Sequence, residues 1–180
     1  MKKINEFNMD NISKMNEFLA FLYECFCCVY LGIVLKQISK ISFYILLLPI
    51  FVIVTLIIHE SIHILFFKIF NKNSRIRIIN NHFKQIFMYQ SNENVYYNKF
   101  QTIIILLSPL IFISVISFIL INCIPFDNIV LLIAMNMIIN AMGSVTDVIS
   151  SINLLTKYFN KKIFIKYELK NDGVNMIILS

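Results

Sequence analysis

Charged residues are scarce in this sequence. Asp, Glu, Lys and Arg together make up 14% of its 180 residues, whereas hydrophobic residues make up 58%. A soluble domain of this length cannot bury so much apolar surface, so the composition indicates an integral membrane protein. Tryptophan is absent, glycine and proline occur three times each, and neither an internal repeat nor a low-complexity linker is present. The sequence therefore predicts a single membrane-embedded domain over residues 1–180.

Cysteine occurs four times, and its positions do not fit a disulfide framework or a zinc knuckle. The cysteines lie in or beside apolar runs, at Cys25, Cys27, Cys28 and Cys123. Such positions are typical of membrane-buried free thiols. The formal net charge of +6 comes from basic residues outside the apolar runs, and no basic–aromatic nucleic-acid motif accompanies it. The charge therefore indicates the anionic headgroups of a lipid bilayer as a partner, and no nucleic acid.

Long apolar runs are what the sequence has in abundance. A membrane helix needs about 18–20 predominantly apolar residues. Four segments reach that length: residues 18–35, 41–67, 100–122 and 128–148. The predicted fold class is mainly α, a polytopic membrane protein with about four transmembrane helices. Tyr96 and Tyr97, just before segment 100–122, are predicted to lie in an aromatic belt at the membrane interface.

Two short hairpins are predicted outside the helices. Residues 75–90 surround Asn80-Asn81, and residues 163–179 surround Asn171-Asp172-Gly173. Extended, alternating stretches around such turn residues are the pattern of a β-hairpin. Each hairpin either caps the cytoplasmic side of the helices or holds an extended substrate strand at a sheet edge.

Basic residues mark one side of the predicted bundle. They gather in the loop 68–99 and in the tail 157–170, whereas the connector 122–128 contains none. Lys and Arg accumulate in cytoplasmic loops. The loop, the tail and both termini are therefore predicted to face the cytoplasm, with the chain in a bacterial cytoplasmic membrane. Lys36 and Lys40 fall on the outer side in this arrangement, against the same rule.

An H-E-x-x-H motif over residues 59–63 ends the apolar run that begins at Ile41. On a helix, His59 and His63 stand at i and i+4 on one face, so both imidazoles can bind one metal ion. Glu60 lies about 100° round the helix, where it can act as general base on a water molecule. Because polar residues in a membrane-length segment are costly, they are usually functional. The motif predicts a zinc site; the alternative is a polar helix end at the membrane interface.

A catalytic zinc site needs three protein ligands and an open position for water. Small and polar residues form one helical stripe of the last apolar segment: Asn136, Asn140, Gly143, Ser144 and Asp147. Such a stripe indicates a face turned towards protein rather than lipid. Asp147 is the only acid of that segment, and a rise of about 1.5 Å per residue puts it at the depth of His59. We predict Asp147 as the third ligand; the rival is His82, in the predicted loop hairpin, and a plain helix-packing face is the alternative.

Three segments carry a resemblance to known proteins: the motif at 59–63, Leu107-Ser108-Pro109-Leu110, and residues 140–147. In these, the chain resembles a bacterial domain-of-unknown-function family of small membrane H-E-x-x-H proteins classed as zincin peptidases. It is similar more distantly to site-2 intramembrane metalloproteases. The resemblance covers roughly residue 41 onwards and implies a zinc-dependent membrane peptidase. In site-2 proteases an Asn-x-x-Pro segment precedes the Asp ligand, whereas Gly143 stands here where the proline would be.

The sequence supports two functions. The first is a membrane-embedded zinc endopeptidase that hydrolyses a peptide bond of a membrane protein or peptide near the cytoplasmic face. In that enzyme zinc is held by His59, His63 and Asp147. Glu60 is the general base, and Asn140 steadies the tetrahedral oxyanion. The second is a non-catalytic membrane protein that binds a metal or a partner. Since a binding site needs no base beside the metal, Glu60 favours the enzyme.

The predicted sidedness can be tested with single cysteines at Asn73, Asn92 and Asn171 in a cysteine-free background. Asn73 and Asn92 lie in the basic loop, and Asn171 directly follows the basic tail. An impermeant thiol reagent should leave them unlabelled in intact cells and label them after lysis. A cysteine at Asn128, the last residue of the outer connector, is the control and should react in intact cells. Labelling of the first two sites from outside would invert the orientation.

Overall fold

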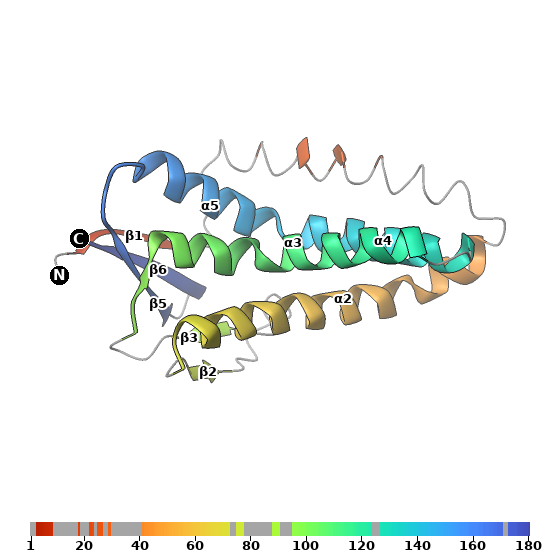
Figure 1. The fold of residues 1–180 in the computed structure, drawn as a ribbon, viewed down its shortest axis with the longest axis horizontal. Helices are drawn as coiled ribbons and strands as arrows, with labels where there is room; N and C mark the ends of the chain where they lie inside the picture. The colour runs from red at the N-terminus through yellow and green to blue at the C-terminus, as the bar shows by residue number, and fades with distance from the viewer. Residues whose placement is uncertain are drawn as a thin grey trace.

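The computed structural model describes residues 3–8, 18, 22, 23, 25, 26, 29, 41–72, 75–77, 88–90, 95–123, 127–170 and 173–180. Most of the predicted first span, 18–35, lies outside these residues. The middle of the predicted loop hairpin and His82 lie outside them as well. Within the described residues the fold is mainly helical, with a small sheet at one end of a helical bundle (Figure 1).

Two long helices, α2 (Ile41–Phe70) and α3 (Lys99–Cys123), run antiparallel, and α4 (Asp127–Gly143) packs against both (Figure 1). The predicted segments 41–67 and 100–122 are therefore helical. Helix α3 and the Pro49–Phe70 part of α2 are each long and apolar enough to cross a membrane.

Helix α5 (Val145–Lys157) follows α4 after a break at Ser144, and the two helices meet at 49°. As one bent unit they form a third candidate span among the described residues. The sequence predicted one continuous helix over 128–148, and the break corrects this. Both the backbone N–H and the hydroxyl of Ser144 bond to the Asn140 carbonyl, at 3.0 and 2.9 Å. The first bond is the ordinary α-helical one, whereas back-bonding of a serine hydroxyl to the carbonyl four residues earlier bends helices.

A four-stranded antiparallel sheet lies at the end of the bundle where α2 ends and α3 begins (Figure 1). Its order is β1 (Lys3–Asn8), β6 (Gly173–Leu179), β5 (Phe164–Lys170) and β4 (Tyr97–Asn98). β5 and β6 form the hairpin predicted over 163–179, with Ile165 opposite Ile178. A separate pair, β2 (Arg75–Arg77) and β3 (Met88–Gln90), belongs to the loop after α2.

The sheet and the helix ends share one hydrophobic core. Along β5, Ile165 and Tyr167 are buried whereas Phe164 is exposed, the alternation of a strand with one face on a core. Phe67 of α2 packs its ring against Tyr97 and Tyr167, with ring centroids 5.4 and 5.2 Å apart. Edge-to-face packing at such distances is favourable for aromatic pairs. Tyr97, predicted at the membrane interface, is therefore a core residue that ties the sheet to α2.

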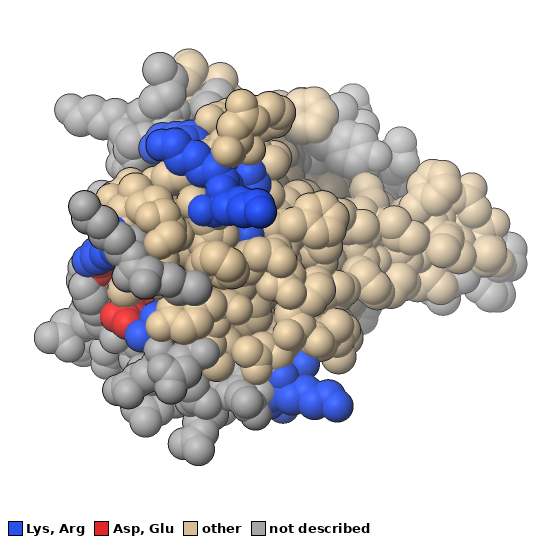
Figure 2. Space-filling model, turned by 60° about the vertical axis from the view of Figure 1, so that its left-hand side comes forward, with Lys and Arg blue, Asp and Glu red and all other residues tan. Residues whose placement is uncertain are grey.

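Charged residues gather at the sheet end of the molecule. Figure 2 shows lysine and arginine side chains over this end, whereas the projecting end of the helical bundle is uncharged on the face in view. Large apolar side chains are exposed on the outer faces of the helices, among them Ile53, Val115 and Phe118. Extensive exposed apolar surface of this kind is compatible with a protein that lies in a membrane.

The shared core gives a test of stability. Ile165→Ala should lower the free energy of unfolding by about 2–5 kcal/mol, because truncation of a fully buried isoleucine leaves a cavity. Phe164→Ala, the neighbour on the exposed face, is the matched control and should change it by about 0.5 kcal/mol or less. Reversible unfolding in detergent, followed by far-ultraviolet circular dichroism, measures both. A loss of about 0.5 kcal/mol or less in Ile165→Ala would show that this side chain is not part of the core.

Candidate metal centre

His59 and His63 occupy one face of α2, a helical turn apart. Both are buried, with exposures of 4% and 5%, and their Nε2 atoms lie 3.1 Å apart. The helix itself sets this arrangement, because residues at i and i+4 stand above one another on its surface. The H-E-x-x-H spacing is therefore realised as a pair of converging imidazoles.

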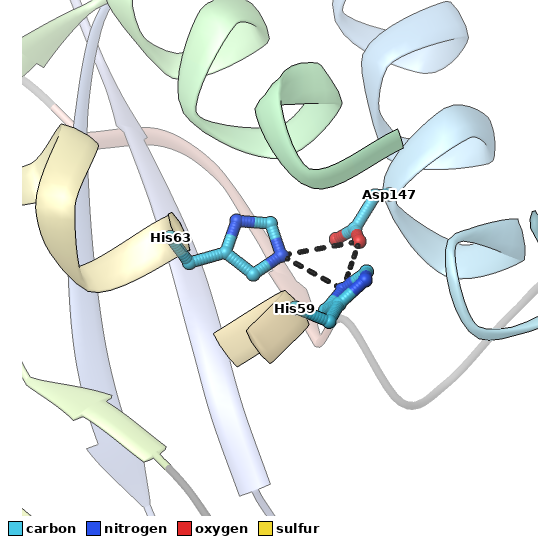
Figure 3. Close-up of side chains that lie close together, drawn as sticks. All are labelled: His59, His63 and Asp147. Atoms are coloured by element: carbon cyan, nitrogen blue, oxygen red, sulfur yellow. Dashed lines mark hydrogen bonds and ion pairs between the residues drawn. The ribbon is translucent and has the colours of Figure 1, made fainter. Parts of the chain in front are cut away.

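Asp147 joins the two histidines from α5 (Figure 3). Its Oδ2 atom lies 3.4 Å from Nε2 of His59 and 3.3 Å from Nε2 of His63, and the residue is 7% exposed. The bend at Ser144 turns the first turn of α5, which carries Asp147, so that it faces α2. The structure thus brings together the three residues predicted as ligands, and they form a group that could hold a metal ion.

The spacing of the three atoms fits zinc. Zn–N and Zn–O bonds of about 2.0–2.1 Å in a tetrahedral site put neighbouring donor atoms roughly 3.3–3.4 Å apart. The edges of the triangle in this protein measure 3.1, 3.3 and 3.4 Å. Two imidazoles and a carboxylate that leave a fourth position open are also a donor set that catalytic zinc sites use.

The Nδ1 atoms of both histidines have hydrogen-bond partners. Nδ1 of His63 lies 2.9 Å from the backbone carbonyl oxygen of Ile105. Nδ1 of His59 lies 3.0 Å from Oδ1 of Asn140, whose amide nitrogen donates to the Pro109 carbonyl at 3.3 Å. Since a carbonyl oxygen can only accept, each Nδ1 carries the proton.

This tautomer decides the character of the site. With protons on both Nδ1 atoms, neutral His59 and His63 present lone pairs at Nε2, and Asp147 presents a carboxylate oxygen. The centre of the triangle is then lined by acceptors, and these three side chains supply no donor to it. Such a cluster, buried in an apolar bundle, is stabilised by a cation at its centre.

The predicted catalytic residues, Glu60 and Asn140, differ in burial and in their contacts with His59. Glu60 is partly buried on α2 beside His59, while Asn140 is almost wholly buried on α4 and bonded to that histidine. The contacts of Asn140 are those of a residue that orients a ligand. Its oxyanion role stays a prediction, and the rival ligand His82 lies outside the described residues.

Sequence reasoning missed the backbone carbonyls of Ile105 and Pro109, because a carbonyl belongs to every residue alike. It also missed Tyr167, which is buried in the core and close enough to Asp147 to feel its charge. Burial raises the pKa of the Tyr167 phenol, and the negative charge of Asp147 raises it further. The phenol therefore stays neutral and adds no negative charge near the ligands. The alternation of 163–169 was the only signal that could have pointed to it.

Residues 51–163 match the DUF3267 family, described as "Putative zincin peptidase". The match covers more than half of the chain and includes all three converging side chains, so the protein belongs to this family. No curated protein and no solved structure matches the chain. The resemblance to the zincin-peptidase family seen in the sequence is thus confirmed, and membership of that family implies zinc.

Two variants separate the candidates for the third ligand. Asp147→Ala should fold but bind little zinc, because it loses one corner of the triangle. His82→Ala should keep wild-type zinc content. Atomic emission or a chromogenic chelator measures the zinc bound by each purified protein, and circular dichroism checks the fold. The opposite ranking would rule out Asp147 and require a site rebuilt around the loop.

Proposed function

We propose that the protein is a membrane-embedded, zinc-dependent endopeptidase that hydrolyses a peptide bond of a membrane protein or peptide near the cytoplasmic face. The observation that carries this proposal is the triangle of His59, His63 and Asp147, with edges of 3.1 to 3.4 Å, immediately beside Glu60. Membership of the zincin-peptidase family supports it.

In amide hydrolysis, three side chains would bind the metal and a fourth would transfer the proton. His59, His63 and Asp147 would hold zinc, which when bound makes a water molecule nucleophilic near neutral pH. Glu60 accepts a proton from that water molecule while the water oxygen attacks the scissile carbonyl carbon. The same carboxyl group then delivers the proton to the leaving amine nitrogen, so that the C–N bond breaks without expulsion of an amide anion.

Asn140 enters this scheme chiefly as the residue that holds His59. Its Oδ1 accepts from Nδ1 of His59, and its amide nitrogen is already directed at the Pro109 carbonyl. To steady the oxyanion, Asn140 would have to release Pro109. The weak 3.3 Å bond to that carbonyl leaves such a switch open as a proposal.

An apolar cavity supports the choice of substrate class. It has a volume of about 310 Å³ and lies between α2, α3 and α4. Ile58 and Ile62, next to the ligand histidines in the chain, line one wall, and Asn136, one turn before Asn140, lines another. Ser117 and Asn136 are the polar residues in a lining that is otherwise apolar. A pocket with such walls suits apolar side chains, which a membrane-spanning or membrane-associated peptide supplies.

The alternative is a metal-binding membrane protein without turnover. The same three ligands would serve it equally well. A general base beside the ligands has no use in such a protein, so the position of Glu60 favours the enzyme.

Glu60→Gln distinguishes these functions. The variant should bind zinc at wild-type stoichiometry, because Glu60 is not one of the three converging side chains. Its peptidase activity should fall at least about 100-fold, since an amide cannot accept the proton of water. The measurement is cleavage of a library of apolar peptides by wild type and variant in detergent, with zinc content determined in parallel. Undiminished cleavage by the variant would remove Glu60 as the base.

A further inference from the structure

Pro109 interrupts the hydrogen bonding of α3 beside the metal centre. In an α-helix the N–H of residue 109 would donate to the carbonyl of residue 105. Proline has no N–H, and its ring also pushes against the carbonyl four residues before it. The carbonyl of Ile105 therefore has no partner from the helix ladder at that position.

Two other donors occupy that carbonyl. Nδ1 of His63 lies 2.9 Å from the Ile105 oxygen, and the hydroxyl of Ser108 donates to it at 2.8 Å. A carbonyl oxygen has two lone pairs, so these two bonds fill it. A backbone N–H at position 109 would be a third donor to the same oxygen.

The same turn of α3 also acts on the other histidine. The Pro109 carbonyl accepts from the amide nitrogen of Asn140. That bond fixes which end of the Asn140 amide faces His59, namely the oxygen. The turn from Ile105 to Pro109 thus sets the orientation of both ligand imidazoles, one directly and the other through Asn140.

We propose that Pro109 is a positioning residue: the N–H it lacks leaves the Ile105 carbonyl free to hold Nδ1 of His63, so that Nε2 faces the metal position. The inference rests on the zinc centre of the proposed function, but it concerns a hydrogen bond of the protein itself. It assigns to this proline a role in ligand orientation, separate from the shape of α3.

Two substitutions separate the effect of the missing N–H from the effect of the proline ring. Pro109→Ala restores an N–H at position 109. The α-hydroxy analogue of alanine, introduced at the same position by nonsense suppression, has the same side chain but an ester oxygen in place of the N–H. The two proteins therefore differ in the N–H and in the Ser108 carbonyl, which is a weaker acceptor in the ester, and their common difference from wild type reports loss of the ring.

Zinc affinity and the tautomer of His63 are measured for each protein. Competition with a chelator gives the zinc affinity, which should be about 10–100-fold weaker in Pro109→Ala, the usual cost of losing the partner of a ligand histidine. The hydroxy analogue should stay near wild type. In metal-free protein, ¹⁵N chemical shifts of labelled histidine should show Nδ1 of His63 protonated in wild type and in the analogue. In Pro109→Ala the proton should shift towards Nε2.

Pro49→Ala is the matched control, because Pro49 also lies inside a long helix, α2, and is exposed. Each ligand histidine finds its Nδ1 partner elsewhere, so this variant should keep wild-type zinc affinity. Wild-type affinity and histidine shifts in Pro109→Ala would overturn the proposal. So would equal losses in Pro109→Ala and the hydroxy analogue, which would place the effect in the ring. If wild type binds no zinc, the proposed function fails, while the histidine shifts still decide the role of Pro109.

Discussion

The site depends on one constraint. The N–H of an imidazole buried among apolar helices must donate a hydrogen bond to an acceptor, which leaves the lone pair of the other ring nitrogen to bind a metal. The protein meets it with an asparagine side chain for His59 and a backbone carbonyl for His63. Both acceptors lie on helices that surround α2. The packing of the bundle therefore determines the tautomer of the ligands. A shift of α3 against α2 would break the hydrogen bond from Nδ1 of His63 to the Ile105 carbonyl.

The third corner of the triangle depends on a bend rather than on a straight helix. Helix α4 ends at Gly143, next to the hydroxyl of Ser144 that bonds back to the Asn140 carbonyl, and α5 leaves at an angle that turns Asp147 towards the histidines. Asn140 therefore acts twice, through its side chain on His59 and through its carbonyl on the bend. One residue couples the orientation of a ligand to the position of another ligand.

Periodicity was sufficient to predict much of this site. The i, i+4 spacing placed His59 and His63 together, and the polar stripe singled out Asp147, because both patterns belong to side chains. The bend was missed since Ser144 fits the same stripe whether the helix continues or stops. The role of Ile105 was missed because its side chain carries no signal for its carbonyl, although a proline four residues later does. Among the helices and strands, the long apolar runs and the tail hairpin were predictable, whereas the burial of Tyr97 needed the pairing of β4 with β5.

The shared sheet also constrains how often the chain can pass through a bilayer. β1 and β4 belong to one sheet although α2 separates them along the chain, and a sheet outside the hydrocarbon layer lies on one side of it. The number of passages between any two of its strands must therefore be even. From β4 to β5, α3 and the bent pair α4–α5 would satisfy this rule. Between β1 and β4, α2 is the one candidate span among the described residues, so those residues alone do not satisfy the rule. Strand pairing thus provides a parity check on topology that is independent of the distribution of positive charge.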